Sequence, residues 1–328
     1  MHTDSLPLAT QGLLRDCATH CPDLDGFLLV GGTALSLQAA HRLSEDLDFA
    51  WPEKKLDRAK VRAVLDVLSA LGKTVVYNNP PDKVEEAIND GIDLDDYQQD
   101  YMVGGVKLTF FAFGDYDRDR QLIRTGLADS RQIGHVAVAD IPTLFATKCI
   151  VLTDRIKSRD LFDLWWMTHR SGLAMSTQSI FETVQQYRPH LPYEHVRHRL
   201  LDWQIPATDE SFDKLVAEPI TIESLRGSFR SDVDQLEENM AISLKDGLTL
   251  FPSLANQWNA RPAIGPQFGE IKAISDQEII QHVGQGRHVG WDRSKLTGDV
   301  DVLEIGSEVE ISKDGVVRTG RVSPSLGI

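Results

Sequence analysis

The first 140 residues alternate between strand-like and helix-like hydrophobic patterns. Apolar residues recur at helical spacing over 6–22, and the run FLLVGG at 27–32 is typical of a short strand that ends in two glycines. TALSLQAAHRL then returns to helical spacing, and EDLDFAW at 45–51 alternates polar and apolar residues as a half-buried strand does. The pattern therefore predicts the order strand, Gly-Gly turn, helix and strand.

Further along this region the same alternation continues. Residues 54–71 have the spacing of an amphipathic helix, and TVVY at 74–77 predicts a strand. Residues 103–113 and 135–140 predict two more strands, and the polar, turn-rich segment 78–100 predicts an exposed excursion. Together these elements indicate a mixed α/β domain with a small sheet.

The pattern changes at Ile141. From there to residue 245, apolar residues recur at helical spacing, which predicts a helical second domain. Residues 246–290 hold many Pro, Gly and aromatic residues, and the end of the chain alternates with period two around Lys313-Asp314-Gly315, which predicts a small β hairpin or barrel. The predicted parts are a core at 1–140, a helical domain at 141–245, and an irregular linker with a small β module at 246–328.

Composition narrows the classes of function. The chain has 328 residues, 41% of them apolar, which is enough for a substantial core, and its three cysteines are too few for a disulfide framework. A formal net charge of −15 argues against a general nucleic-acid binder, so an RNA partner would need a local basic surface. With no secretory signal pattern and no apolar segment of membrane-spanning length, we expect a cytoplasmic protein without a membrane partner.

Two acidic residues, Asp46 and Asp48, are the strongest candidates for chemistry. They lie two positions apart on a predicted strand, so both side chains leave one face with Cα atoms about 6 to 7 Å apart, while Leu47 and Phe49 face the core. Two carboxylates placed in this way can share a metal, and a pair of Mg²⁺ ions about 3.5 to 4 Å apart would need such ligands, with one ion activating the attacking hydroxyl and the other holding the triphosphate oxygens. This arrangement serves phosphoryl or nucleotidyl transfer. By itself, an Asp-x-Asp pattern is common on exposed strand faces.

A phosphate-binding turn precedes this pair. Gly31 and Gly32 let the backbone approach a phosphate closely, and the helix that follows offers N–H groups at its positive end. Thr33 can cap the helix or donate its hydroxyl to a phosphate oxygen. Arg42 can pair with phosphate or brace the carboxylates, and Ser44 lies beside it. A Gly-Gly pair alone is usually a tight turn, so the prediction depends on the joint order of these residues.

These residues resemble a known family. GGTALSLQAAHRLSEDLDF is similar over its whole length to the first motif of the AbiEii-type nucleotidyltransferase toxins, members of the DNA polymerase β-like nucleotidyltransferase superfamily. LFATKCIVLTDRIKSRDLFDL at 144–164 resembles the later motif of that family, and the resemblance covers residues 25–170 well and the region to about 245 loosely. It implies the fold class α/β (α+β), with a polymerase β-like nucleotidyltransferase core and a helical second domain that together bind NTP and Mg²⁺.

The resemblance also implies roles for single residues. Those that it assigns to the site are Gly31, Gly32, Thr33, Asp46, Asp48, Lys148 and Asp160. Lys148 would neutralise triphosphate charge, and Asp160 would orient the nucleotide or act as a base. The alternative is that Lys148 is a solvated helix residue and that Asp160 and Asp163 pair with Arg155 or Arg159 along the chain.

One feature departs from the family pattern. Polymerase β-like enzymes usually supply a third carboxylate from a neighbouring strand, but the strand expected to carry it has Lys107 and Thr109 on its polar face. Either two aspartates suffice, or a residue from elsewhere completes the site, with Asp95, Asp96 and Asp100 of the preceding loop as candidates.

Basic residues in two helical segments offer a surface for an RNA acceptor despite the acidic composition. They are Arg155, Lys157, Arg159, Arg188, Arg197 and Arg199. The alternative is a helical face held by salt bridges.

Three functions stay open at this point. The resemblance implies an enzyme that adds nucleotides to RNA, with tRNA as the expected acceptor, and that acts as the toxin of a toxin–antitoxin or phage-defence pair with a cognate antitoxin protein. A second variant transfers nucleotide or phosphate to a protein. The third is a catalytically inactive relative that binds nucleotide or a partner, which the missing third carboxylate keeps open.

Overall fold

The structure is a computed structural model in which two compact units are distinguished. One unit comprises Met1–Tyr187 and Arg197–Ser231, and the other comprises Arg188–Val196 and Asp232–Ile328. The residues that the structure describes are 2–114, 116–205, 209, 216, 220–245, 258, 260–263, 265–275, 277–284 and 287–319, without the side chains of 240–245 and 301. The linker predicted to begin at residue 246 therefore lies, up to residue 257, outside the described residues.

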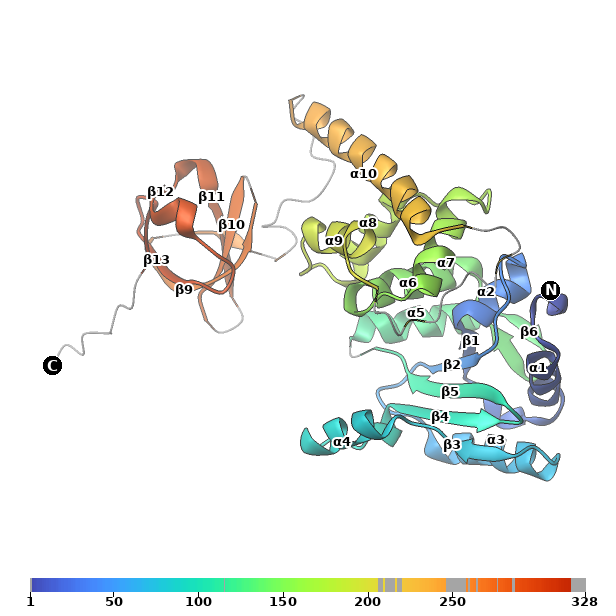
Figure 1. Cartoon of the computed structure of the whole chain (residues 1–328). Helices are drawn as coiled ribbons and strands as arrows, with labels where there is room; N and C mark the ends of the chain where they lie inside the picture. Colours follow the sequence, from blue (N-terminus) through green and yellow to red (C-terminus); the bar gives the residue numbers. More distant parts are fainter. Residues whose placement is uncertain are drawn as a thin grey trace. The chain divides into compact units, whose positions relative to one another are not determined.

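The first unit is built on a mixed sheet (Figure 1). Its strands are β1 Leu28–Val30, β2 Leu47–Trp51, β3 Val75–Tyr77, β4 Gln98–Val103, β5 Val106–Ala112, β6 Arg131–Ile133 and β7 Val136–Val138. Their order across the sheet is β3-β4-β5-β2-β1-β7-β6, with β2 parallel to β5 and antiparallel to β1. Strand β2, which carries Asp48, therefore lies in the middle of the sheet.

Helices cover this sheet and continue beyond it. They are α1 Leu8–His20, α2 Gly31–Ala39, α3 Arg58–Ala70, α4 Pro81–Asn89, α5 Asp117–Ala128, α6 Ile141–Asp154, α7 Ser158–His169, α8 Thr177–Tyr187, α9 Tyr193–Leu201 and α10 Ile222–Lys245, with short 3₁₀ turns η1 Thr3–Ser5, η2 Pro22–Leu24 and η3 Leu94–Asp96. In the view of Figure 1, α3 lies below the sheet and α2, α5 and α6 lie above it. Helix α6 packs against α2, α5, α7 and α8, and α7 also packs against α2, so α6 and α7 contact the core directly.

The strand pattern read from the sequence is present in β2. Leu47 and Phe49 are fully buried, whereas Asp48 between them is half-buried on the opposite face. The Phe49 ring stacks on Phe110 of the neighbouring strand β5, with ring centroids 5.7 Å apart. The predicted mixed α/β core followed by helices is confirmed.

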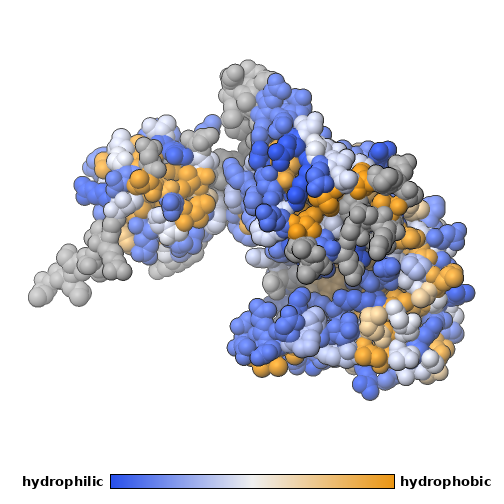
Figure 2. Space-filling model, in the orientation of Figure 1, coloured by the Kyte–Doolittle hydropathy of each residue, from blue (hydrophilic) through white to orange (hydrophobic). Residues whose placement is uncertain are grey.

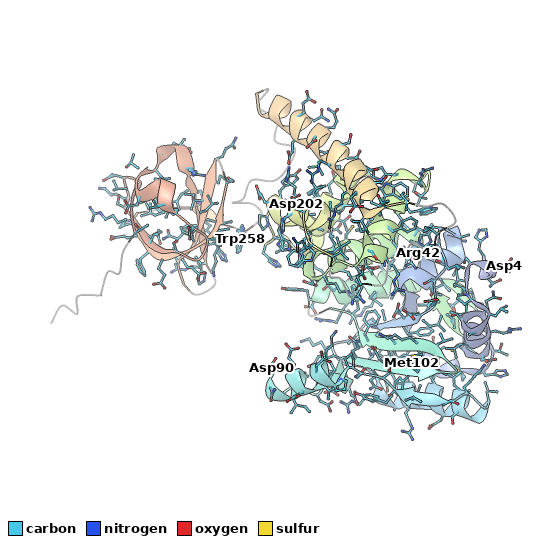
Figure 3. The ribbon with its side chains drawn as sticks, viewed as in Figure 1. Asp4, Arg42, Asp90, Met102, Asp202 and Trp258 are labelled. Atoms are coloured by element: carbon cyan, nitrogen blue, oxygen red, sulfur yellow. The ribbon has the colours of Figure 1, made fainter. Side chains whose placement is uncertain are left out.

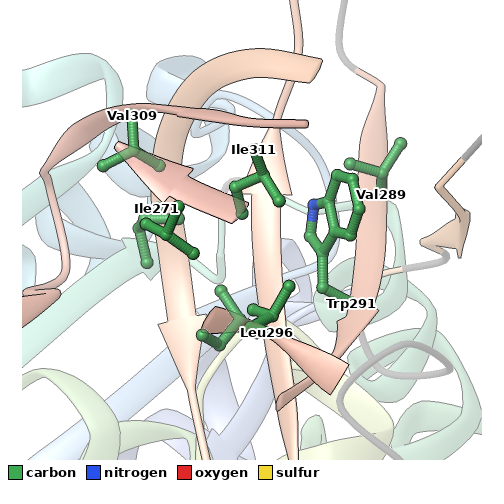
Figure 4. Packing of buried hydrophobic residues seen from close by; sticks show 8 residues of the cluster. Ile271, Val289, Trp291, Leu296, Val309 and Ile311 are labelled. Carbon is green, nitrogen blue, oxygen red and sulfur yellow. The ribbon is translucent and has the colours of Figure 1, made fainter. Parts of the chain in front are cut away.

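A second sheet forms the β module of the other unit. Its strands are β8 Arg261–Pro262, β9 Gln267–Ile274, β10 Glu278–His282, β11 His288–Asp292, β12 Thr297–Gly298, β13 Glu308–Ile311 and β14 Val316–Thr319, with 3₁₀ turns η5 Arg293–Lys295 and η6 Asp299–Val302. Figure 4 shows how Ile271, Val289, Trp291, Leu296, Val309 and Ile311 pack between the strands. The hairpin predicted around residues 313–315 is confirmed, because β13 and β14 pair antiparallel.

The structure departs from the predicted pattern at two places and adds a helix at a third. Residues 103–113 are not one strand, since β4 ends and β5 begins around a turn in which Gly104 and Gly105 have φ of +57° and +85°. The segment 78–100, predicted as an exposed excursion, contains α4, whose residues are all exposed or half-buried. The weakly periodic region 246–290 contains β8, β9, β10 and part of β11.

The surface agrees with the weak apolar signal of α4. In Figure 2 the side chains in the region of α4 are predominantly hydrophilic. Within the part of the chain that the structure describes, every helix is too short or too polar to cross a bilayer.

Candidate active site

A cavity of about 380 Å³ opens beside the start of β2. Its walls come from β1, α2, β2, β5, α6 and α7, and the residues that line it include Val30, Gly31, Thr147 and Val151. The charged side chains on these walls are Arg42, Asp46, Asp48, Lys107, Lys148, Asp154, Arg155, Lys157, Arg159 and Asp160. Basic side chains outnumber acidic ones here, although the whole chain carries a net charge of −15.

The two aspartates lie together on the wall formed by the sheet. Asp48 is paired in register with Val30 of β1 and Thr109 of β5, and Asp46 directly precedes the strand. Both carboxylates line the cavity. A Cβ atom on Gly31 would lie 2.7 Å from Asp48 Oδ2, so the glycine backbone and this carboxylate are in direct contact. The sequence-predicted pair and the glycine turn are therefore brought to one place.

Both glycines are required by the local geometry. Gly31 has φ of +74°, in the left-handed region that favours glycine. Gly32 faces the Arg42 guanidinium and the Ser44 hydroxyl, and a Cβ atom at this position would lie 2.9 Å from Ser44 Oγ. Helix α2 begins at Gly31, and the first N–H groups of a helix have no acceptor within it. This end of α2 can therefore donate to a phosphate oxygen.

Thr33 has a different role from the one expected. The residue before α2 is Val30, which makes no side-chain cap, so the prediction that Thr33 caps the helix is wrong. The Thr33 hydroxyl is buried, contacts Ser44 Oγ at 2.9 Å and donates to the carbonyl oxygen of Asp46. Thr33 therefore fixes the backbone that presents Asp46, and its side chain does not line the cavity.

A buried ion cluster joins the α2–β2 connection to the helices. Asp163 of α7 is fully buried and accepts from Arg42 Nε at 2.7 Å and Arg42 Nη2 at 3.0 Å. His41 Nε2 lies 2.8 Å from Asp163 Oδ1, and Lys148 Nζ lies 2.8 Å from Asp163 Oδ2. Arg42 is labelled in Figure 3, where it lies near α2. The predicted alternative, in which Asp163 pairs with the nearby residues Arg155 or Arg159 of the same chain segment, is thus wrong.

The charges in this cluster hold one another in their ionised forms. Burial alone would raise the pKa of Asp163, but the charges of Arg42 and Lys148 hold it well below its usual range. Burial alone would lower the pKa of Lys148, but Asp160 and Asp163 raise it. Burial would likewise raise the pKa of Asp160, and the Lys148 charge lowers it. All three groups are therefore charged at neutral pH.

Lys148 of α6 and Asp160 of α7 line the same cavity as the aspartate pair. Lys148 is 8% exposed, so it is not a solvated helix residue, and its Nζ lies 2.5 Å from Asp160 Oδ1. The other oxygen, Asp160 Oδ2, is buried and has no hydrogen-bond partner among the described residues. Since a buried carboxylate oxygen without a partner is costly, this atom is suited to accept a hydrogen bond from a bound ligand.

The metal-binding capacity of the cavity comes from two carboxylates. Among the described residues, no three His, Cys, Asp or Glu side chains form a group that could hold a metal ion. Mg²⁺ in nucleotide sites is commonly held by one or two carboxylates together with substrate phosphates and water. Asp46 and Asp48 beside the glycine turn fit that donor set.

The predicted alternatives for a third carboxylate lie elsewhere. Asp95 accepts from the Tyr77 hydroxyl, and Asp96 pairs with Lys55 at 2.6 Å. Asp100 is not in a loop but in strand β4, where it pairs with Lys107 at 2.8 Å. The short hairpin between β4 and β5 concealed this strand in the sequence.

The predicted basic surface is only partly present. Arg155, Lys157 and Arg159 line the cavity. Arg199 lies over the Trp203 ring, with its guanidinium carbon 4.0 Å from the ring centroid, and Arg188 is buried. The basic side chains available to an acceptor at the site are therefore those of the α6–α7 connection.

Comparison with known proteins assigns the chain to a family. The family model described as nucleotidyl transferase AbiEii toxin, type IV TA system, matches residues 12–258. The chain belongs to the AbiEii family. The description of this family model is that of nucleotidyl transferase toxins of a type IV toxin–antitoxin system. Enzymes of this family generally use a divalent metal ion.

Individual relatives of this AbiEii-family chain are distant. The uncharacterized protein aq_aa25 of Aquifex aeolicus (strain VF5) is 24% identical over 147 residues, which are 44% of this chain and 59% of that protein. The chain thus matches about three fifths of the length of this curated relative.

Two solved structures show partial similarity. The crystal structure of JHP933 from Helicobacter pylori is 20% identical, with a TM-score of 0.37 over 73% of this chain and 96% of that chain. MenT4, the nucleotidyltransferase toxin Rv2826c of Mycobacterium tuberculosis H37Rv, is 16% identical, with a TM-score of 0.36 over 73% of this chain and 90% of that chain.

The Asp163 cluster yields a prediction about stability. Asp163→Ala leaves Arg42 and Lys148 as buried cations without a central counter-charge, so we expect it to lower the free energy of unfolding by about 3 to 5 kcal/mol. The matched control is Asp66→Ala, which removes an exposed i,i+4 pair with Arg62 and is expected to change that free energy by less than about 0.5 kcal/mol. Chemical denaturation followed by circular dichroism measures both, and equal effects would contradict the assigned role.

Asp48 yields a prediction about pH. Burial raises the pKa of Asp48 to about 6, and the neighbouring Asp46 charge adds to this effect. Protons and metal compete for this carboxylate, so Mg²⁺ affinity should be constant above about pH 7 and fall by up to about tenfold per pH unit below about pH 6. Titration calorimetry with Mg²⁺, at pH values below about 6 and above about 7, measures this affinity. An affinity independent of pH would show that Asp48 is not a ligand.

Proposed function

We propose that this AbiEii-family chain transfers a nucleotide from an NTP to RNA, with tRNA as the acceptor, in a reaction that depends on Mg²⁺. The observation that carries the proposal is the cavity itself. Asp46 and Asp48 lie on one wall beside the Gly31–Gly32 backbone, and Lys148 and Asp160 lie on another. Carboxylates for a metal, N–H groups for phosphate and a buried cation thus surround one space.

Each residue has a chemical task in this reaction. The first N–H groups of α2 at Gly31 and Gly32 bind phosphate oxygens of the triphosphate, and Lys148 neutralises part of its charge. Mg²⁺ held by Asp46 and Asp48 would shield the triphosphate charge and polarise the phosphorus. Asp160, through its unpaired Oδ2, accepts a hydrogen bond from the nucleotide or from the attacking hydroxyl.

Two further residues prepare the site. Arg42 lines the cavity and is held by Asp163, so its guanidinium braces the phosphate-binding end of α2. Ser44 also lines the cavity and is held by Thr33. In the transfer, an acceptor oxygen bonds to the α-phosphorus, the bond from that phosphorus to pyrophosphate breaks, and the acceptor hydroxyl loses its proton.

The choice of RNA as acceptor rests on charge. Arg155, Lys157 and Arg159 lie together at the cavity wall of a chain whose net charge is −15. Such a local cluster attracts a phosphate backbone without making the whole protein a nucleic-acid binder. RNA and nucleotides meet in the cytoplasm, so we place the protein there, where it acts as the toxin of its pair.

Labelling distinguishes the acceptors. The purified chain is incubated with Mg²⁺, each α-labelled NTP in turn, and either total tRNA or cell protein, and labelled products are separated by gel. We expect labelled tRNA, and we expect Asp48→Asn to reduce the signal by at least about 100-fold, because a metal ligand is lost. Asp66→Asn on the exposed face of α3 is the matched control and keeps full activity. Label in cell protein and not in tRNA would show that the acceptor is a protein. No label in either would contradict the proposal.

A further inference from the structure

A row of polar residues crosses three neighbouring strands beside the aspartate pair. Asp48 of β2 is in register with Thr109 of β5, and Thr109 is in register with Asp100 of β4. Residues in register on adjacent strands point to the same face of a sheet. Asp48, Thr109 and Asp100 therefore share the face on which the cavity lies. The position next to Asp48 thus holds a neutral hydroxyl where a third carboxylate would be needed for a second metal ion.

Lys107 lies close to the aspartate pair on strand β5. Leu47 pairs with Leu108, so Asp46 and Lys107 each directly precede one member of this pair. Lys107 lines the cavity with both aspartates, and its Nζ lies 2.8 Å from Asp100 Oδ2. Strand β5, the next strand in the sheet, thus presents a hydroxyl and a cation beside the aspartate pair, and the next anion, Asp100, lies one strand further on.

Asp100 holds Lys107 and is not available to a metal. Its side chain is 3% exposed, one oxygen contacts Lys107, and the other accepts from Gln98 Nε2 at 3.0 Å. Its backbone N–H donates to Asn79 Oδ1, which fixes this part of β4. A buried carboxylate with both oxygens used in this way is a fixed anchor, so the lysine is held at the edge of the cavity.

We propose that the chain binds one divalent cation, at Asp46 and Asp48. The Lys107 ammonium group takes the place of the second divalent cation that a two-metal enzyme binds. A second divalent ion beside the first would need further oxygen ligands from the sheet, and strand β5 offers the Thr109 hydroxyl and the Lys107 ammonium group next to the aspartates instead. Lys107 then stabilises the negative charge that the acceptor oxygen gains as its proton passes to water, before that oxygen bonds to the α-phosphorus and pyrophosphate leaves. This inference rests on the proposed function.

Counting bound metal tests the inference without an acceptor. Mn²⁺ replaces Mg²⁺, and electron paramagnetic resonance measures the free ion during titration of the full chain in the presence of an NTP analogue with a methylene group between the α- and β-phosphorus atoms. The concentration of the analogue is held equal to that of the protein, and a titration without protein gives its own Mn²⁺ binding. We expect one Mn²⁺ per chain. Two per chain, or none, would overturn the inference.

Substitution of the lysine gives two readouts that move in opposite directions. Lys107→Gln removes a like charge from the metal site, so Mn²⁺ should bind about threefold or more tightly, whereas nucleotide transfer should slow by about tenfold or more. Lys83→Gln on the exposed side of α4 makes the same change in net charge and should alter neither. A purely structural role would weaken both metal binding and transfer, and that result would overturn the inference.

Failure of this inference is distinguishable from failure of the proposed function. If wild-type protein labels RNA but binds two Mn²⁺, the inference fails and the function stands. If it binds one Mn²⁺ but labels no acceptor, the proposed function fails, and with it the role of Lys107 in transfer. The wild-type count needs no variant, so the test remains decisive even if Lys107→Gln does not fold.

Discussion

The arrangement of the site depends on one buried carboxylate. Asp163 lies on α7 and contacts Arg42, which follows α2, and Lys148 of α6. These two contacts join the connection that leads into β2 to α6 and α7. Because each partner is buried and charged, none of these groups can be separated from the others without leaving an uncompensated charge. The aspartates at the start of β2 are thereby held at one cavity with Lys148 and Asp160.

The electrostatics of the cavity follow from this arrangement. Asp46 and Asp48 concentrate negative charge on the sheet wall, and burial places the pKa of Asp48 at about 6. The remaining walls carry an excess of basic side chains, and glycines expose the first N–H groups of α2. A divalent cation is attracted to the acidic wall, and a triphosphate is attracted to the basic walls and to the N–H groups of α2. A triphosphate that carries a divalent cation is therefore complementary to all of these walls. This complementarity is the physical link between the AbiEii family membership of the chain and its proposed reaction.

Local patterns allowed part of this to be predicted. Strand alternation placed Asp46 and Asp48 on one face, and the Gly-Gly pair next to them reflects a close approach that only glycine allows. The ion cluster could not be predicted, because Asp163 meets Arg42 across 121 positions of the chain and nothing in the spacing of either residue marks the other. Helix α4 buries none of its residues and lies in a polar, turn-rich segment, strands β8 to β10 lie in a region rich in Pro and Gly, and the hairpin at Gly104–Gly105 hid the strand that carries Asp100. The roles of the site residues stay predictions.

Asp46 and Asp48 are proposed to bind a divalent metal next to the Gly31–Gly32 backbone. Anomalous diffraction from crystals grown with Mn²⁺ and a non-hydrolysable NTP analogue locates that metal. We expect a manganese peak within about 2.0 to 2.4 Å of oxygens from both carboxylates, with phosphate oxygens at the start of α2. A peak that lies away from Asp46 and Asp48, or a triphosphate bound elsewhere in the chain, would contradict it.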